Sequence, residues 1–154
     1  MWVNGHATVP AHINLGFAVQ TDRGVAVPVI PHAAHRSLSE LSAARIRLAQ
    51  AARSGKLSPE DLADGTFTLT NLGMYPVDFF VPVINHPQSS MLATGRLREL
   101  AEIESSGQST AWYMWVNLAV DHRVADGARA AEFLRDLEAA FESLQINKHP
   151  KRER

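Results

Sequence analysis

The chain has 154 residues, a hydrophobic content of 45%, a charged content of 20% and a formal net charge of −1 at pH 7. These values describe one ordinary globular domain and give no electrostatic reason to expect nucleic acid or a membrane surface as a partner. The absence of cysteine excludes disulfide bonds, a thiolate nucleophile and a zinc–thiolate site. No apolar run of membrane-spanning length and no signal-peptide pattern occurs, so we expect a cytoplasmic protein.

The first part of the sequence predicts a β-hairpin. Apolar and polar residues alternate over 12–20 as in a half-buried strand, and residues 25–30 form a second apolar run. Between them, Thr21 to Gly24 supply turn residues. Pro28 cannot donate a backbone hydrogen bond, which favours a sheet edge or the rim of a site for this position.

A helix is predicted after the hairpin. Ser37 and Glu40 form a capping-box pattern, and the apolar positions from Leu38 to Ala52 have helical spacing. Gly55 is expected to end this helix.

The second half predicts four more strands and a second helix. Turn residues separate strand candidates around 66–71, 79–85 and 90–97, and a longer aromatic and β-branched strand is expected over 111–121. An amphipathic helix follows from about residue 127 to residue 145.

Mixed strands with two substantial helices predict an α/β domain, in which a mixed β-sheet has helices on one face. We expect this domain to span residues 1–146 and a polar, solvated tail to span 147–154.

The segment 121–127, with the sequence DHRVADG, places His122 where a strand gives way to a helix. A side chain at such a junction is held in place and can face a cleft, as a general base requires. A histidine in this position is, by itself, more often a packed or surface residue than a catalyst. Asp126 lies where a helix N-cap belongs, and capping alone would account for it.

Other histidines and two tryptophans have simpler explanations than ligand binding. His32 and His35 are three residues apart and His86 stands elsewhere, but no cysteine or carboxylate pattern accompanies them, so we expect no metal site. Trp112 and Trp115 are three apart in one predicted strand, which places them on opposite faces, one in the core and one at an interface.

Three segments of this sequence resemble the catalytic domain of the dihydrolipoamide acyltransferases, the core components of 2-oxo acid dehydrogenase complexes. These segments are FTLTNLG at 67–73, VINHPQ at 83–88 and DHRVADG at 121–127. The resemblance extends from about His12 to Leu144. It implies the two-layer sandwich fold of chloramphenicol acetyltransferase and direct acyl transfer between dihydrolipoamide and coenzyme A, without a covalent acyl-enzyme.

The resemblance also implies roles for individual residues. His122 would act as the base, because an imidazole of ordinary pKa near ~6.5 can accept the proton of a thiol of pKa near ~8.5. Thr70 stands where the family has a serine whose hydroxyl donates to the oxyanion, and threonine keeps that donor but adds a methyl group. Asp126 would support the loop, while Asn71 and Gly73 would shape the turn after the Thr70 strand.

The family resemblance further implies a homotrimer. Its active-site channel would lie between subunits, so monomers would be inactive. Coenzyme A would be a substrate, the lipoyl group would be carried on another domain or chain, other 2-oxo acid dehydrogenase complex components would be partners, and no metal would be involved.

The sequence departs from the family pattern in two places: the first supports a rival hypothesis, and the second argues against assembly of trimers into a larger cage. The family's catalytic domain has helices and a strand before the point that matches Met1, and the end from Ile146 to Arg154 is basic where cage-forming members bury an apolar segment. The rival is a shortened, non-catalytic scaffold or oligomerisation module of the same fold. Acyl transfer to a small alcohol or amine is a third possibility, and the sequence leaves open which acyl group is carried.

Overall fold

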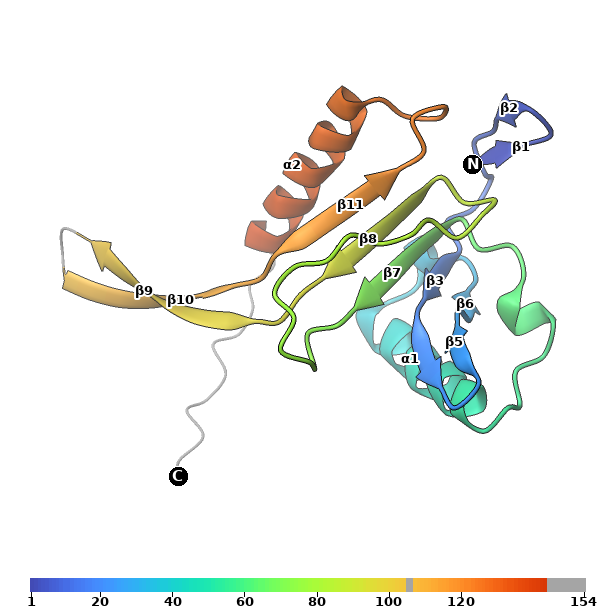
Figure 1. The fold of residues 1–154 in the computed structure, drawn as a ribbon, viewed down its shortest axis with the longest axis horizontal. Coiled ribbons are helices and arrows are strands. Elements are labelled where there is room, and N and C mark those ends of the chain that lie inside the picture. The colour runs from blue at the N-terminus through green and yellow to red at the C-terminus, as the bar shows by residue number, and fades with distance from the viewer. Residues whose placement is uncertain (105–106, 144–154) are drawn as a thin grey trace.

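The computed structural model describes residues 1–104 and 107–143, and a five-stranded mixed sheet forms its centre (Figure 1). The strand order is β11-β8-β7-β3-β6, with β7 in the middle and parallel to both of its neighbours. The outer strands β11 and β6 run antiparallel to β8 and β3. The five strands are β3 (Leu15–Phe17), β6 (Val29–Ile30), β7 (Phe67–Asn71), β8 (Ser90–Thr94) and β11 (Val116–Val120).

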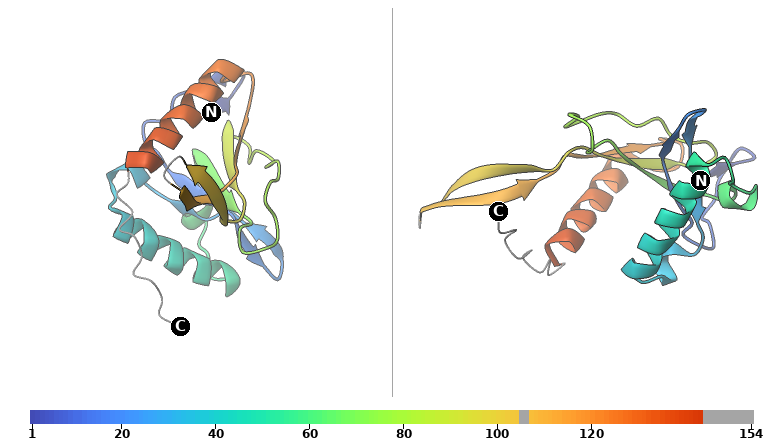
Figure 2. Two further views of the ribbon diagram at one scale, coloured as in Figure 1. Left: turned by 90° about the vertical axis from the view of Figure 1, so that its left-hand side faces the viewer. Right: turned by 90° about the horizontal axis from the view of Figure 1, so that it is seen from below.

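Two helices, α1 (Leu38–Arg53) and α2 (Gly127–Ser143), lie on the same face of this sheet (Figure 2). Leu48 of α1 is 1% exposed and packs with Phe17 and Ile30 in the main apolar cluster. The ring of Phe133 on α2 lies 5.7 Å from that of Phe67 on β7. The predicted α/β architecture, a mixed sheet with helices on one face, is therefore confirmed.

The start and the end of α1 follow from the residues that predicted them. The Ser37 hydroxyl accepts a hydrogen bond from the Glu40 backbone, and the Glu40 carboxylate accepts one from the Ser37 backbone at 2.7 Å. Both bonds satisfy amide groups that the first helical turn leaves without partners. Gly55 follows the helix at φ +67°, a left-handed conformation that glycine adopts without strain.

The predicted hairpin forms, but as four short strands instead of two. After β3 the chain continues as β4 (Val19–Thr21), turns at residues 22–23, and returns as β5 (Gly24–Ala26) and β6. Pro28 lies directly before β6, which is an edge strand of the sheet. A small separate hairpin, β1 (Trp2–Val3) and β2 (His6–Ala7), precedes these strands.

The strands predicted at 90–97 and 111–121 are each interrupted. Beyond β8 the chain becomes β9 (Arg98–Glu104), which pairs with β10 (Gly107–Tyr113) as a long hairpin projecting from the sheet (Figure 1). The interruption falls at Gly95, where the backbone of Asp78 approaches so closely that a Cβ atom would overlap its carbonyl group. Trp112 lies in β10 of the projecting hairpin, Trp115 lies at the break between β10 and β11, and they are 62% and 66% exposed. The prediction that one of these tryptophans is a core residue is wrong.

The strand predicted at 79–85 is also wrong. These residues form no strand and cross the sheet on the face opposite the helices (Figure 2). The Asn117 side chain donates to the Phe80 carbonyl at 2.9 Å, and Arg98 holds Asp78 through two hydrogen bonds of 2.6 and 2.7 Å. Side-chain bonds therefore anchor this segment in place of a backbone ladder. Its alternating apolar residues face solvent instead of a core.

Two of the sequence predictions concern the C-terminal end of the described residues. The second helix was predicted to residue 145 and is described to Ser143. The predicted tail at 147–154 lies outside the described residues. Two short 3-10 turns, η1 (Ala33–His35) and η2 (Glu60–Leu62), complete the elements. Neither described helix has the length and apolar content that a membrane crossing requires.

Candidate functional site

His122 lies in the tight turn that joins β11 to α2 and its side chain is exposed. Asp121 anchors this turn at its start, because its amide donates to the Ser89 carbonyl at 2.7 Å. The Asp121 carbonyl then accepts from the amides of Val124 and Ala125. These bonds fix the backbone on both sides of His122, so the imidazole stands on a rigid support as the sequence predicted.

Arg123 adds a second restraint that sequence reasoning missed. Its guanidinium donates to both carboxylate oxygens of Asp121, at 2.6 Å for the shorter Nη2 bond, and this bond lowers the pKa of Asp121 to about 2. On its other side, Arg123 stacks over the Trp2 ring, 4.7 Å from its centroid. The pairing of two residues so close in sequence could have been foreseen, but the contact with the distant Trp2 could not.

Asp126 caps α2. Its side-chain oxygen accepts a hydrogen bond from the Arg129 backbone amide at 2.9 Å, as expected of an N-cap. No hydrogen bond joins Asp126 to His122 within the described residues. The carboxylate therefore orients the end of the His122 loop by fixing where the helix begins.

Thr70 lies on β7, facing away from the helices, and is 8% exposed. Its same-face neighbour Thr68 is fully buried and donates to the Gln88 side chain at 2.6 Å. At the last residue of the strand, the Asn71 side chain accepts from the Gly73 amide at 2.6 Å, and it shapes the turn as predicted. Thr70 is thus a buried hydroxyl beneath the segment that crosses this face.

Within one protomer, His122 and Thr70 do not come together. Thr70 pairs with Ala93 and Ala93 with Asn117, so the row that contains Thr70 crosses β11 five residues before His122. At about 3.3 Å per residue and about 4.8 Å per strand, the two side chains are on the order of 15–20 Å apart. A base and an oxyanion donor must both lie within about 3 Å of the reacting atoms. The two residues can serve one reaction only from different protomers.

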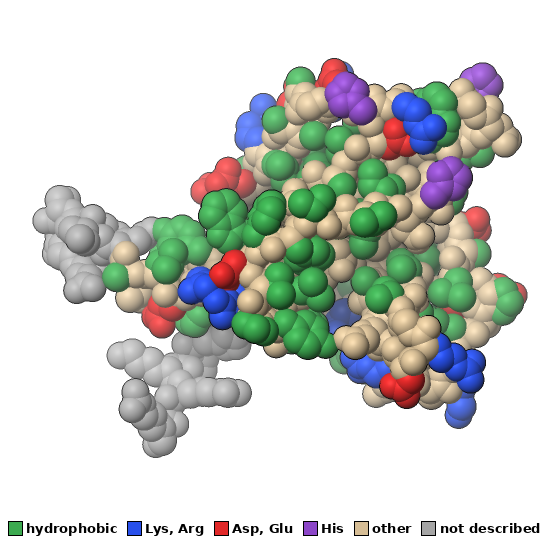
Figure 3. Space-filling model, viewed as in Figure 1, with side chains coloured by type: hydrophobic (Ala, Val, Ile, Leu, Met, Phe, Trp, Pro, Cys, Tyr) green, Lys and Arg blue, Asp and Glu red, His purple; other side chains and the backbone are tan. Residues whose placement is uncertain are grey.

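The face that covers Thr70 is unusually apolar. Figure 3 shows hydrophobic side chains gathered across the middle of this face. We call this the apolar face and define it by four exposed residues: Phe79, Val81, Val83 and Trp115, which are 57%, 70%, 85% and 66% exposed. Large exposed apolar patches commonly mark interaction surfaces. The apolar face is therefore a candidate subunit interface next to Thr70.

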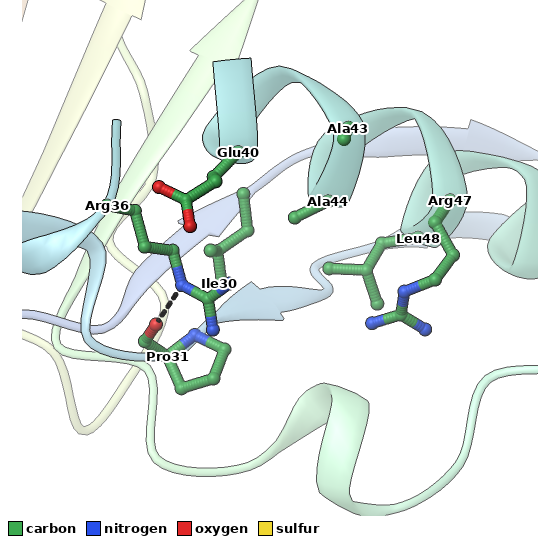
Figure 4. A pocket seen from close by; sticks show the side chains of 8 residues that line it. All are labelled: Ile30, Pro31, Arg36, Glu40, Ala43, Ala44, Arg47 and Leu48. Carbon is green, nitrogen blue, oxygen red and sulfur yellow. Dashed lines mark hydrogen bonds between the residues drawn. The ribbon is translucent and has the colours of Figure 1, made fainter. Parts of the chain in front are cut away.

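A hollow of about 410 Å³ lies elsewhere, along α1. Figure 4 shows Ile30, Ala44 and Leu48 forming its apolar floor, with the guanidinium of Arg36 bonded to the Pro31 carbonyl. The hollow is lined by none of the three predicted site residues, and it is open. It is not part of the candidate acyl-transfer site.

The histidines considered for metal binding occupy ordinary positions. The His32 ring contacts the His12 ring edge-on, with centroids 4.3 Å apart. His86 lies near the Asp121 carboxylate, and His35 is in η1. In residues 1–104 and 107–143, three or more ligating side chains do not gather around any common point.

A mixed sheet with two helices on one face and a histidine loop between β11 and α2 defines a domain of the chloramphenicol acetyltransferase-like class. The sequence model of the 2-oxoacid dehydrogenases acyltransferase (catalytic domain) family matches residues 2–147, and the chain belongs to this family.

Relatives of known name support this assignment. The chain is 39% identical over 123 residues to the dihydrolipoyllysine-residue succinyltransferase component of the 2-oxoglutarate dehydrogenase complex of Bartonella vinsonii subsp. berkhoffii; the match covers 80% of the chain and 30% of the relative. The chain thus spans about a third of the length of this relative.

Solved structures agree with the sequence comparison. A dihydrolipoamide acetyltransferase of Azotobacter vinelandii superposes with a TM-score of 0.84 at 31% identity, over 90% of this chain and 58% of the other. That structure served to investigate a serine, a histidine and an asparagine in the enzyme's catalytic mechanism. A probable dihydrolipoamide acetyltransferase of Listeria monocytogenes superposes with a TM-score of 0.85 at 30% identity, over 97% of this chain and 64% of the other.

Proposed function

We propose that this domain transfers an acyl group between dihydrolipoamide and coenzyme A in a 2-oxo acid dehydrogenase complex. His122 acts as the general base, Thr70 donates to the oxyanion and Asp126 holds the His122 loop. The lipoyl group is carried on another domain or chain, and other components of the complex are partners. Family membership supports the reaction class, since the named relatives are dihydrolipoamide acyltransferases.

The observation that carries the residue assignment is their spacing. The serine and the histidine studied in the Azotobacter vinelandii enzyme are 52 positions apart, and its asparagine follows four positions after the histidine. In this chain Thr70 and His122 are also 52 positions apart, and Asp126 follows His122 by four. Hydroxyl, imidazole and polar side chain thus occur in the same order with the same separations.

The active site that we propose is a channel between protomers of a homotrimer. The distance between His122 and Thr70 in one chain requires each site to combine the base of one protomer with the hydroxyl of its neighbour. The apolar face provides a surface for such contact, and Thr70 lies beneath it. Contact between protomers would also remove bulk water, which strengthens hydrogen bonds to a developing charge.

The chemistry requires one proton acceptor and one fixed donor. His122 accepts the proton of the attacking thiol, and the resulting thiolate adds to the thioester carbonyl carbon. Thr70 donates to the oxygen that becomes negative, which stabilises the transition state more than the ground state. When the tetrahedral intermediate collapses, the carbon–sulfur bond to the leaving group breaks, and the departing sulfur takes the proton back from His122.

The experiment is an assay of the purified chain with coenzyme A and an acyl-dihydrolipoamide, together with its mass in solution. His122→Ala should lower kcat by about 10²–10⁴-fold, the usual contribution of a general base, while the trimer remains intact. His35→Ala is the matched control, because it removes the same type of side chain at a position outside the site, and it should retain wild-type turnover. Trimeric protein with no His122-dependent turnover would instead identify a non-catalytic scaffold.

A further inference from the structure

The motif VINHPQ at 83–88 carries part of the family resemblance, but its residues have no part in the proposed proton transfer or oxyanion contact. Its last residue is nonetheless almost completely buried. Gln88 is 4% exposed, and its side-chain oxygen accepts a hydrogen bond of 2.6 Å from the hydroxyl of Thr68 on β7, which is 0% exposed. A buried polar group that loses its partner is strongly unfavourable. The hydrogen bond therefore ties residue 88 to the central strand of the sheet.

Two glycines leave little space around the Thr68–Gln88 pair. A Cβ atom at Gly16 on β3 would lie 2.7 Å from the Thr68 hydroxyl oxygen, and one at Gly65 would lie 2.6 Å from the Gln88 amide nitrogen. Both distances are shorter than the separation at which nonbonded heavy atoms normally pack. The backbone thus closes around the two side chains, and because a close-packed interior resists displacement, Gln88 is held in one position.

The residue that follows Gln88 anchors the turn of His122. The Ser89 carbonyl accepts the hydrogen bond of 2.7 Å from the Asp121 amide, and Asp121 directly precedes His122. Because Ser89 is adjacent to Gln88 in the chain, the position of its carbonyl group depends on where Gln88 is fixed. A hydrogen bond on the central strand thereby influences where the His122 turn begins.

The residue that precedes Gln88 supports the same turn from its other side. The Pro87 carbonyl accepts a hydrogen bond of 3.3 Å from the Trp2 amide. The Trp2 ring in turn lies 4.7 Å from the Arg123 guanidinium, and Arg123 directly follows His122. The two neighbours of His122 are thus connected to the two neighbours of Gln88.

We propose that Gln88, fixed by Thr68, is a positioning residue for the general base, because it holds the carbonyl groups that set the position of the His122 turn. This role rests on the proposed function, in which His122 accepts the thiol proton. Proton transfer requires the two heavy atoms to lie within about 3 Å of each other, and a displacement of about 1 Å can cost about 10²-fold in rate. Gln88 acts through the backbone and makes no contact with the reacting atoms.

The test removes the hydrogen bond from either side. Thr68→Val replaces the hydroxyl with a methyl group of similar size, and Gln88→Met removes the amide and leaves β7 unchanged. Thr68→Ser keeps the hydroxyl donor and should restore wild-type behaviour. Thr21→Val is the matched control, because it removes a half-buried hydroxyl that donates to the Gly24 carbonyl at 2.8 Å in the β4–β5 hairpin, outside the path from Gln88 to His122.

The first measurement is amide hydrogen exchange in the purified chain without substrates. In Thr68→Val and Gln88→Met, we expect the Asp121 amide to exchange about tenfold faster than in the wild type or more, because its acceptor is no longer fixed. The Lys56 amide, which is hydrogen-bonded at the end of α1, should be unaffected and reports any global loss of stability. Wild-type exchange at Asp121 in both variants would overturn the proposal.

The second measurement is steady-state acyl transfer. Thr68→Val and Gln88→Met should lower kcat by about 10–100-fold with KM nearly unchanged, because the base is displaced and the substrate contacts are not. Thr68→Ser and Thr21→Val should retain wild-type kcat. Unchanged kcat in the first two variants, despite faster exchange at Asp121, would overturn the positioning role.

Failure of the proposed function gives a different result. A wild-type chain with no His122-dependent turnover would contradict the proposed acyl transfer. Exchange at the Asp121 amide, which needs no substrate, would still decide whether Gln88 holds the His122 turn.

Discussion

At the scale of single residues, this protein has an exposed imidazole on a hydrogen-bonded turn and a buried hydroxyl that lie far apart in one chain. The His122 turn is fixed by bonds from Asp121 and by the Arg123–Trp2 stack, whereas Thr70 is fixed by its place in the central strand. Neither group has the other within reach in one chain. Substitutions at each position therefore test separate steps of the proposed reaction.

Thr70 can be tested by removing its hydroxyl and keeping its shape. Thr70→Val should lower kcat by about 10²–10³-fold with folding intact, because an oxyanion donor of this kind contributes roughly 2.7–4 kcal/mol. Thr70→Ser keeps the donor and should retain most of the turnover. Steady-state kinetics of both variants provide the measurement, and near-normal turnover in Thr70→Val would remove this hydroxyl from the mechanism.

The Asp121–Arg123 pair predicts a specific pH dependence. Because the folded pKa of Asp121 is about 2 against an ordinary value of 3.8, this carboxylate stabilises the fold above about pH 4, and the contribution is lost as the pH falls towards 2. In Arg123→Met, the pKa of Asp121 should rise towards its ordinary value, and the acid-dependent loss of stability that Asp121 contributes should largely disappear. NMR titration of the Asp121 carboxyl carbon measures this directly; an unchanged pKa in the variant would contradict the assignment.

At the scale of secondary-structure elements, α2 begins where it does because Asp126 caps it. The cap determines the length of the turn that carries His122, so the start of the helix and the position of the proposed base are linked. A carboxylate at this end also interacts favourably with the helix dipole. The start of α2 thus depends on Asp126, a side chain to which the family resemblance also gives a functional role.

The two roles of Asp126 can be separated by substitution. Asp126→Ala should lower the free energy of unfolding by about 1 kcal/mol, the usual cost of losing an N-cap. Asp126→Asn keeps a good cap and matches the residue type studied in the Azotobacter vinelandii enzyme, so stability and turnover should both be close to wild type. Urea unfolding and the acyl-transfer assay distinguish the cases; a large loss of turnover in Asp126→Asn would show that the charge itself is needed.

At the scale of the whole molecule, the exposed apolar surface lies on both sides of the sheet. The apolar face covers the Thr70 side, and a cavity between α2 and the sheet opens on the helix side. The first surface is the one that we propose contacts a second copy of the chain. A domain that stands alone rarely exposes so much apolar surface on two faces.

The apolar face can be tested with one charge. If the proposed trimer forms through this face, Val81→Glu should convert it to monomer and abolish turnover, because a carboxylate buried in an apolar contact without a partner is strongly unfavourable. Leu38→Glu is the matched control, since Leu38 is 82% exposed at the start of α1 on the helix side. Light scattering after gel filtration gives the mass, and a Val81→Glu variant that remains trimeric would place the interface elsewhere.

Local patterns in the sequence determined much of this protein. Alternation over 12–20, the Ser37–Glu40 capping box and the amphipathic stripe after Gly127 each depend on neighbours within a few residues, and the corresponding elements exist. The motif around His122 and its separation from Thr70 could likewise be identified from the sequence alone. The family assignment followed from these local features.

Only the tertiary structure decided the rest. The alternation at 79–85 is as regular as that of a strand. Yet hydrogen bonds from Asn117 to Phe80 and from Arg98 to Asp78 hold this segment, and no local pattern reveals these partners. The close approach of Asp78 to Gly95 divides a predicted strand for the same reason. The separation of His122 from Thr70 depends on strand order and register, which are long-range properties. Sequence patterns report the conformation that nearby residues favour, whereas contacts between distant residues determine which surfaces are buried and which side chains can meet.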